Sequence, residues 1–101
     1  MKIPKKLKVG AHTFTVRLAK ARDHQKGPNY WGKTNYDSNT ITVDNEITPT
    51  MMEEVFLHEV LHVCFSRAGL DVKYDSRDEE ENIVNAMAQQ LYPILKENHL
   101  I

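Results

Sequence analysis

The sequence predicts one α+β domain over residues 1–101, in which an N-terminal, mostly antiparallel sheet is followed by two helices. In the first third of the chain, apolar and polar residues alternate with the two-residue period of a half-buried strand. After residue 43 the apolar residues take up helical spacing instead. Strands that precede helices in this order favour a domain whose helices pack on one face of the sheet.

The strands are expected as two hairpins. Four short segments carry the strand pattern: residues 7–9, 14–18, 30–36 and 40–43. Gly10-Ala11 supplies the turn of the first hairpin, and Asp37-Ser38-Asn39 lies in the turn of the second. Residues 20–29 are interpreted as a loop, because this stretch ends in Gly-Pro-Asn. The last strand, Thr-Ile-Thr-Val, is β-branched throughout, which suits a pleated sheet.

The first helix is expected from Met51 to about Arg67. Thr48 is placed as its N-cap and Pro49 as its first residue, where the missing N–H has no partner to lose. Apolar residues lie on almost every side of this segment, which indicates a helix buried round most of its circumference. Gly69 is expected to end it.

A second helix is expected to begin at Ser76-Arg77-Asp78-Glu79, which has the form of a capping box. Its apolar residues follow one stripe: Val84, Met87, Ala88, Leu91 and Leu95. Pro93 should kink or break the helix near its end, because proline removes a backbone donor and crowds the preceding turn.

Composition restricts the class of partner. Thirteen Lys and Arg against fourteen Asp and Glu give a formal net charge of −1, without the basic excess of a nucleic-acid binder. The lysines at the start of the chain (Lys2, Lys5, Lys6 and Lys8) are interpreted as a solvated sheet edge, not a phosphate-binding patch. A single cysteine and the lack of a bilayer-length apolar segment favour a cytoplasmic protein without a membrane partner. The sequence does not fix an oligomeric state.

The segment His58-Glu59-Val60-Leu61-His62 carries the chemistry. Histidines four residues apart on a helix point to the same side, one turn apart, so two nitrogens can share a zinc ion at ~2.0–2.1 Å. Glu59 points about 100° away and can reach a zinc-bound water without binding the metal. The alternative is a pair of core histidines bonded to carbonyls, a costly arrangement in so apolar a helix.

A catalytic zinc site takes a third protein ligand, and no histidine follows His62 closely. The expected donor is the acidic run Asp78-Glu79-Glu80-Glu81, which the second helix returns over the first. On a helical wheel Glu80 lies nearer the middle of the apolar stripe, so it should be the more buried carboxylate. Favourable placement of acids at a helix N-terminus explains Glu79 without a metal.

These residues resemble the gluzincin metallopeptidases, and the chain looks most like the small phage-type members related to the ImmA/IrrE family. The similar segments are Tyr30-Trp31-Gly32-Lys33, Thr40-Ile41-Thr42-Val43, Phe56-Leu57-His58-Glu59-Val60-Leu61-His62-Val63 and Glu80-Glu81-Asn82-Ile83-Val84. The resemblance implies a zincin-like minimal metallopeptidase fold, a zinc cofactor, and a phage origin with the host cytoplasm as location. It also implies that the third ligand is a glutamate on the second helix.

In the family pattern this glutamate stands three residues before a small or apolar residue and four before a polar one. Glu81 fits, with Val84 and Asn85 following, and the resemblance makes Asn85 a partner that holds the ligand. The helical wheel favours Glu80 and the resemblance favours Glu81. We choose Glu81.

The sequence therefore predicts a zinc metalloendopeptidase in which His58, His62 and Glu81 hold the metal and Glu59 is the general base. A peptide or protein substrate is expected to lie extended along an edge strand, taken as residues 40–43. Two alternatives remain open: a catalytically inactive, zinc-stabilised interaction module of phage origin, and a metal-free protein with core histidines.

Other residues have smaller expected roles. Tyr74, between the helices, is a candidate for polarising a substrate carbonyl, and Cys64 is expected to be a buried small hydrophobe. Tyr30 and Trp31 are expected to anchor the packing. The isolated histidines are expected to be exposed: His12, His24 and His99.

Overall fold

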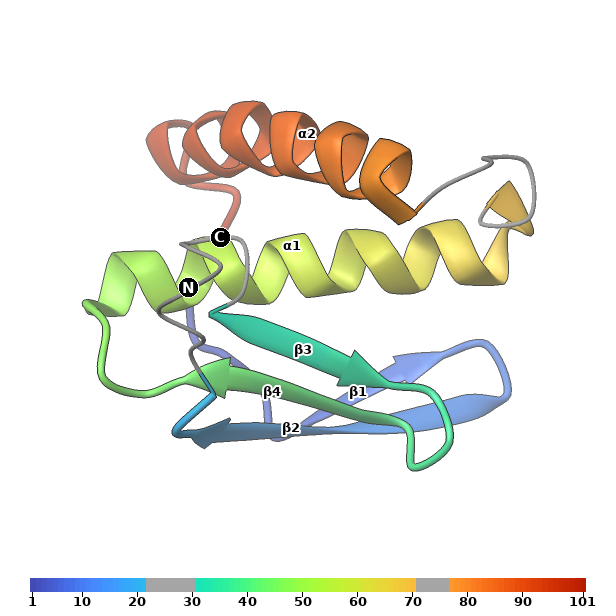
Figure 1. Ribbon diagram of the computed structural model, residues 1–101. Helices are drawn as coiled ribbons and strands as arrows, with labels where there is room; N and C mark the ends of the chain where they lie inside the picture. The colour runs from blue at the N-terminus through green and yellow to red at the C-terminus, as the bar shows by residue number, and fades with distance from the viewer. Residues whose placement is uncertain (22–30, 71–76) are drawn as a thin grey trace.

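The strands and helices expected from the sequence are all present. The computed structural model describes residues 1–21, 31–70 and 77–101 (Figure 1). Its strands and helices are β1 (Lys6–Val9), β2 (His12–Ala19), β3 (Gly32–Asn35), β4 (Thr40–Asp44), α1 (Pro49–Arg67) and α2 (Arg77–Glu97). The predicted α+β class is confirmed.

The sheet is mixed, with the strand order β1-β2-β4-β3. Both hairpins are antiparallel, and the first turns at Gly10, whose φ of +61° is a conformation that glycine adopts without strain. The two hairpins meet through β2 and β4, which are parallel and pair Val16 with Ile41. The prediction of a mostly antiparallel sheet therefore holds within the hairpins but misses the parallel contact between them.

Strand β4 lies inside the sheet. It pairs with β2 on one side and with β3 on the other, and its side chains Ile41 and Val43 are completely buried. The prediction that residues 40–43 offer an edge to a substrate is therefore wrong, because both rows of their backbone groups are used in pairing. Among the described strands, β1 and β3 form the edges. The lysines of β1, Lys6 and Lys8, are exposed, as expected of a solvated edge.

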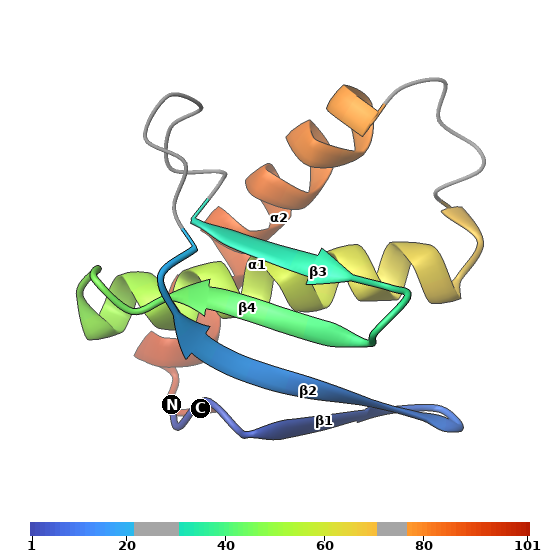
Figure 2. The ribbon, with the colours of Figure 1, turned by 60° about the horizontal axis from the view of Figure 1, so that its bottom comes forward.

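Helix α1 forms the middle layer of the molecule. Figures 1 and 2 show the sheet on one side of α1 and α2 on the other, so α2 packs on α1 and not on the sheet. This position explains why α1 is apolar almost all round. The core between sheet and helix consists of Phe14, Val16, Ile41, Val43, Val55, Phe56 and Val63.

Both ends of α1 lie where the sequence predicts them. The Oγ1 of Thr48 accepts a hydrogen bond from the N–H of Met51 at 3.3 Å, and Pro49 is the first residue of the helix. Just beyond the last turn, Gly69 has a φ of +72°, which favours glycine. These local signals hold because they satisfy backbone groups that the helix itself leaves unpaired.

Helix α2 buries a narrower stripe than the sequence predicts. Val84 and Ala88 are buried against α1, but Met87 is 51% exposed, so its assignment to the buried stripe is wrong. Met87 lies about 100° round the helix from Ala88, outside the face that α1 covers. Pro93 does not break the helix, which continues to Glu97. The predicted cap Ser76 lies outside the described residues.

A polar cluster joins the two helices near the chain ends, which lie close together in Figure 2. Glu53 of α1 is buried and accepts hydrogen bonds from the Tyr92 hydroxyl at 2.5 Å and from Lys96 Nζ at 3.0 Å. The amino group of Met1 lies 2.6 Å from the other Glu53 oxygen. Among the described residues, neither helix combines the length and low polarity that a membrane span requires.

Candidate metal centre

Helix α1 places the two histidines and Glu59 in the interior. The side chains of His58, Glu59 and His62 are buried, with residue exposures of 6%, 5% and 4%. Because His58 and His62 are one helical turn apart, their rings meet edge-on, with Nε2 atoms separated by 3.2 Å. The ligand atoms of the three residues all lie within 4.8 Å of one another. The sequence-predicted cluster therefore exists in the fold.

Helix α2 adds two neighbouring carboxylates to this cluster. Glu81 Oε1 lies 2.7 Å from His58 Nε2, and Glu81 Oε2 lies 2.9 Å from His62 Nε2. Glu80 lies on the far side of the His62 ring, with Oε2 2.5 Å from Nδ1. The helical-wheel expectation that Glu80 is the more buried of the two is confirmed. It is nevertheless Glu81 that faces both Nε2 atoms.

The arrangement of these nitrogen and oxygen atoms favours a proton or a metal ion between the rings. A carboxylate can only accept hydrogen bonds, so Nδ1 of His62 carries the proton that it donates to Glu80. In a neutral ring, Nε2 of His62 then presents a lone pair. This lone pair points at Nε2 of His58 and at a Glu81 oxygen, which are themselves electron-rich. Only a proton or a metal ion stabilises such a convergence.

The spacing of the two histidine nitrogens fits a zinc ion. Tetrahedral coordination at ~2.0–2.1 Å places neighbouring ligand atoms ~3.3–3.4 Å apart. The two Nε2 atoms are 3.2 Å apart, whereas the Glu81 oxygens lie at hydrogen-bond distances from them, 2.7 and 2.9 Å. Two imidazoles and one carboxylate form the ligand set of many catalytic zinc sites, which leave a fourth position for water or substrate.

Glu59 is held apart from the histidines. Thr34 of β3 donates a hydrogen bond from Oγ1 to Glu59 Oε1 at 2.8 Å, while Glu59 Oε2 is 4.0 Å from His58 Nε2. Both Glu59 and Glu81 lie near the histidine nitrogens, but Glu81 is the closer by more than an ångström. Glu81 is therefore the better candidate for a third ligand, and Glu59 lies farther from His58.

Burial and neighbouring charges both shift the pKa values of these groups. Burial raises the pKa of Glu59, as does the negative charge of Glu81, against the hydrogen bond from Thr34 and the nearby histidines. Burial also raises the pKa of Glu81, but its contacts with His58 and His62 together outweigh this and lower the pKa to about 2. For His62, burial lowers the pKa, and the Glu81 and Glu80 contacts outweigh it, so the pKa is raised.

Strand β3 approaches α1 closely beside Glu59. A Cβ atom at Gly32 would lie 2.7 Å from Val55 Cγ1 and 3.2 Å from Glu59 Cγ, so glycine permits this approach. Sequence reasoning did not assign a role to Gly32 or Thr34. A glycine within a strand pattern is a recognised sign of close backbone approach, whereas nothing in the sequence singles out Thr34.

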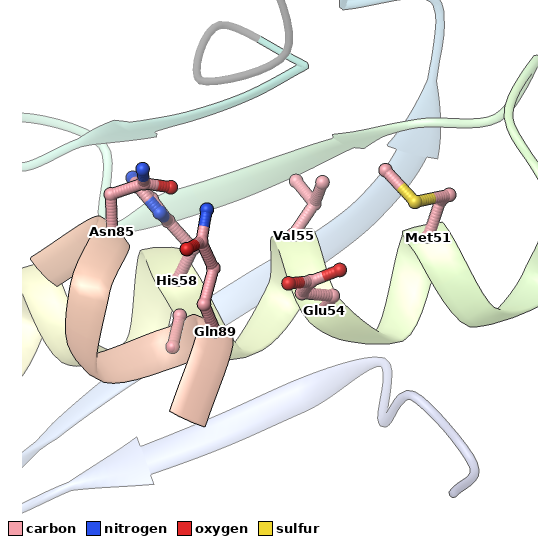
Figure 3. A pocket seen from close by; sticks show the side chains of 7 residues that line it. Met51, Glu54, Val55, His58, Asn85 and Gln89 are labelled. Atoms are coloured by element: carbon pink, nitrogen blue, oxygen red, sulfur yellow. The ribbon is translucent and has the colours of Figure 1, made fainter. Parts of the chain in front are cut away.

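A small pocket adjoins His58 between the two helices (Figure 3). It has a volume of about 90 Å³ and is lined by Met51, Glu54, Val55, His58, Asn85, Ala88 and Gln89. Asn85 thus lies beside His58 at the pocket wall, and its predicted role as a partner of Glu81 remains a prediction. Sequence reasoning did not predict the pocket, because its two walls come from helices that are distant along the chain.

The remaining sequence-predicted residues have varied outcomes. His12 and His99 are exposed, and Trp31 packs against the core, as expected. Cys64 is exposed, so the prediction that it is buried is wrong; it lies on a side of α1 that neither the sheet nor α2 covers. Like Ser76, the residues His24, Tyr30 and Tyr74 lie outside the described residues.

The chain matches no protein-family model, and comparisons with the curated proteins and with the solved structures gave no match. Any function assigned to the chain must therefore be argued from the chemistry of its own residues. The group formed by His58, Glu59, His62 and Glu81 is the natural starting point, because it unites three buried ionisable side chains of α1 and a partly buried one of α2 with an adjacent pocket.

Proposed function

We propose that the chain is a zinc-dependent metallopeptidase of the zincin-like type. The observation that carries this proposal is the convergence of two Nε2 atoms and the Glu81 carboxylate, with the separate Glu59 carboxylate alongside. His58, His62 and Glu81 would hold the ion, and Glu80 would fix the His62 ring through Nδ1. A bound zinc ion supplies Lewis-acid polarisation of a carbonyl and a water whose pKa is near 7.

Glu59 is proposed as the general base. Its carboxylate would accept a proton from the attacking water and later deliver that proton to the leaving amine of the cleaved peptide. Burial supports this role, because it raises the pKa of Glu59 towards the pH at which an acid–base group works best. The hydrogen bond from Thr34 fixes one oxygen of the carboxylate and leaves the other to face the metal position.

The open edge of β3 is proposed as the substrate-binding strand, in place of residues 40–43. The N–H of Asp44 donates to the Trp31 carbonyl at 2.8 Å, so the backbone of residue 31 faces β4. Because this facing alternates along an antiparallel strand, the N–H and C=O groups of Gly32 and Thr34 point to the other side. No described strand pairs there. An extended peptide could add to this edge directly beside Glu59.

The first test separates the general base from the ligands. Glu59→Gln should retain one zinc ion per chain but lose hydrolysis, by about a hundredfold or more, because the variant lacks an acid–base group. Zinc content is measured by elemental analysis, and hydrolysis with a mixed fluorogenic peptide library, with and without chelator. His62→Ala is the matched variant and should lose both zinc and activity.

The outcomes distinguish three classes of protein. Hydrolysis by wild type that chelator and Glu59→Gln both abolish supports the proposal. Zinc binding without cleavage of any peptide in the library would instead identify an inactive, zinc-stabilised interaction module. Failure of the wild-type protein to take up zinc when titrated would contradict both, and would leave a protein with core histidines.

A further inference from the structure

The pocket beside His58 is a cleft between α1 and α2 (Figure 3). From α1 come Met51, Glu54, Val55 and His58, spaced so that they lie on one face of the helix. The volume of about 90 Å³ suits a single side chain. It is well below the ~300 Å³ of sites for drug-sized ligands. The occupant is therefore one residue of a larger molecule.

The lining is aliphatic with one charged group. Met51, Val55 and Ala88 provide apolar walls, and among the described lining residues the only carboxylate is that of Glu54. Asn85 and Gln89 of α2 add side-chain amides whose oxygens accept hydrogen bonds (Figure 3). An aliphatic stem that ends in several N–H donors would match these surfaces.

The formal charge of the described lining is acidic. No Lys or Arg is among the described residues of the lining, and Glu54 is acidic. An acidic side chain in the pocket would be repelled by Glu54, whereas a cationic one would pair with it at low cost in desolvation, because Glu54 is only partly buried.

We propose that this pocket binds a lysine or arginine side chain of a peptide. The assignment of that residue to a position next to the scissile bond rests on the proposed function, since it follows from the contact of the pocket with His58. Glu54 is the specificity-determining residue: its carboxylate pairs with the cationic end, while Met51 and Val55 contact the stem. The preference for cationic residues is a property of the pocket and does not require hydrolysis.

Binding to a variant that does not hydrolyse peptide tests this inference directly. Zinc-loaded Glu59→Gln is titrated with labelled peptides that differ only in one residue, which is Lys, Met or Glu, and dissociation constants are measured by fluorescence anisotropy. The Lys peptide should bind about tenfold more tightly than the Met peptide, and the Glu peptide most weakly. Adding Glu54→Gln should remove the difference between Lys and Met.

Two further variants test whether the charge of Glu54 sets the preference. Glu54→Lys should reverse the order, so that the Glu peptide binds most tightly. Glu97→Gln, which removes an exposed carboxylate at the far end of α2, should leave the preference unchanged. Thermal unfolding of each variant shows whether it is folded. Equal binding of the three peptides, or a Lys preference that persists in folded Glu54→Gln, would overturn the inference.

Failure of the pocket assignment is distinguishable from failure of the proposed peptidase function. If wild type cleaves peptides without regard to lysine and arginine, the pocket assignment is wrong and the peptidase stands. If no peptide is cleaved but the Glu54-dependent preference is measured, the pocket assignment stands and the enzyme is replaced by a peptide-binding module.

Discussion

At the scale of single residues, the two adjacent carboxylates of α2 have different partners. Consecutive helical residues point about 100° apart, so Glu80 contacts Nδ1 of His62 and Glu81 contacts the Nε2 atoms of both rings. In the proposed zinc site, Glu81 would bind the ion and Glu80 would orient the His62 ring. Such an outer partner sets which ring nitrogen is protonated and thereby which one is available to bind metal.

This division of roles predicts unequal losses of zinc affinity. Glu80→Gln should weaken zinc binding by about ten- to a hundredfold, because it removes an orienting partner but no ligand. Glu81→Gln should weaken it further, because it removes a charged ligand. Competition with a chelator of known affinity measures both. A larger loss in Glu80→Gln than in Glu81→Gln would reverse the assignment of ligand and partner.

Gly32 gives a second prediction at this scale. Gly32→Ala places a Cβ 2.7 Å from Val55 Cγ1, so β3 or Val55 must move, at a cost of about 1–3 kcal/mol in the free energy of unfolding. Urea denaturation measures the cost. Trimming the neighbour as well, in Gly32→Ala with Val55→Ala, should show a coupling that offsets part of the clash. Strictly additive losses in the double variant would mean that the two side chains do not meet.

The sequence is most informative about residues that act within one turn of helix. His58, Glu59 and His62 could be found because their spacing alone places them together. Thr34 and Gly32 could not, because they reach Glu59 and Val55 only after β3 has docked on α1. Cys64 was misjudged for a related reason: apolar neighbours in sequence do not reveal which side of α1 stays uncovered.

At the scale of elements, hairpins and helix ends were predictable and the joining of the hairpins was not. Gly10, Thr48 and Gly69 mark boundaries because each satisfies a local backbone requirement. The parallel pairing of β2 with β4 instead depends on which strand is best buried in the centre of the sheet. β4 takes that place, and β3 is left at the edge beside the candidate site.

The Glu53 cluster should make the free energy of unfolding depend on pH in the acid range. Hydrogen bonds from the Met1 amino group and from Tyr92 lower the pKa of Glu53 from 4.5 to about 2. A lowered pKa contributes stability that is fully present above pH 4.5 and is lost as the pH falls through about 2. Glu53→Gln should therefore remove about 2 kcal/mol of stability at pH 7 and much less at pH 2.

Denaturant unfolding of wild type and Glu53→Gln across this range measures the difference. Subtracting the two curves removes the contribution of Glu81, whose pKa is also lowered. Tyr92 titrates at alkaline pH, because burial and the Glu53 contact raise its pKa to about 12. Its contribution to stability is therefore lost only as the pH rises through that value. A difference between the two proteins that is the same at pH 7 and pH 2 would contradict the role given to Glu53.

At the scale of the whole molecule, the candidate metal centre and the polar cluster hold the same pair of layers together. α2 packs mainly on α1, with Val84 and Ala88 buried and Ile83, Leu91 and Leu95 partly buried. Polar contacts add to this packing: the Glu53 cluster near the chain ends, and Glu80 and Glu81 at the histidines. A chain of 101 residues has a modest core, so polar contacts between its helices contribute a larger share of its stability.

Removal of zinc should therefore loosen α2 more than the sheet. Zinc bound by His58 and His62 on α1 and Glu81 on α2 would stabilise only the docked arrangement, by RT ln(1 + [Zn]/Kd), or about 4 kcal/mol at a thousandfold excess over Kd. Chelator should lower the melting temperature and increase hydrogen exchange in α2, while β2 and β4, which pair independently of α2, keep most of their protection. His58→Ala is the control, because chelator should then have no effect. If zinc removal left exchange in α2 unchanged, or accelerated it equally in the central strands, the ion would not be what holds the second helix on the first.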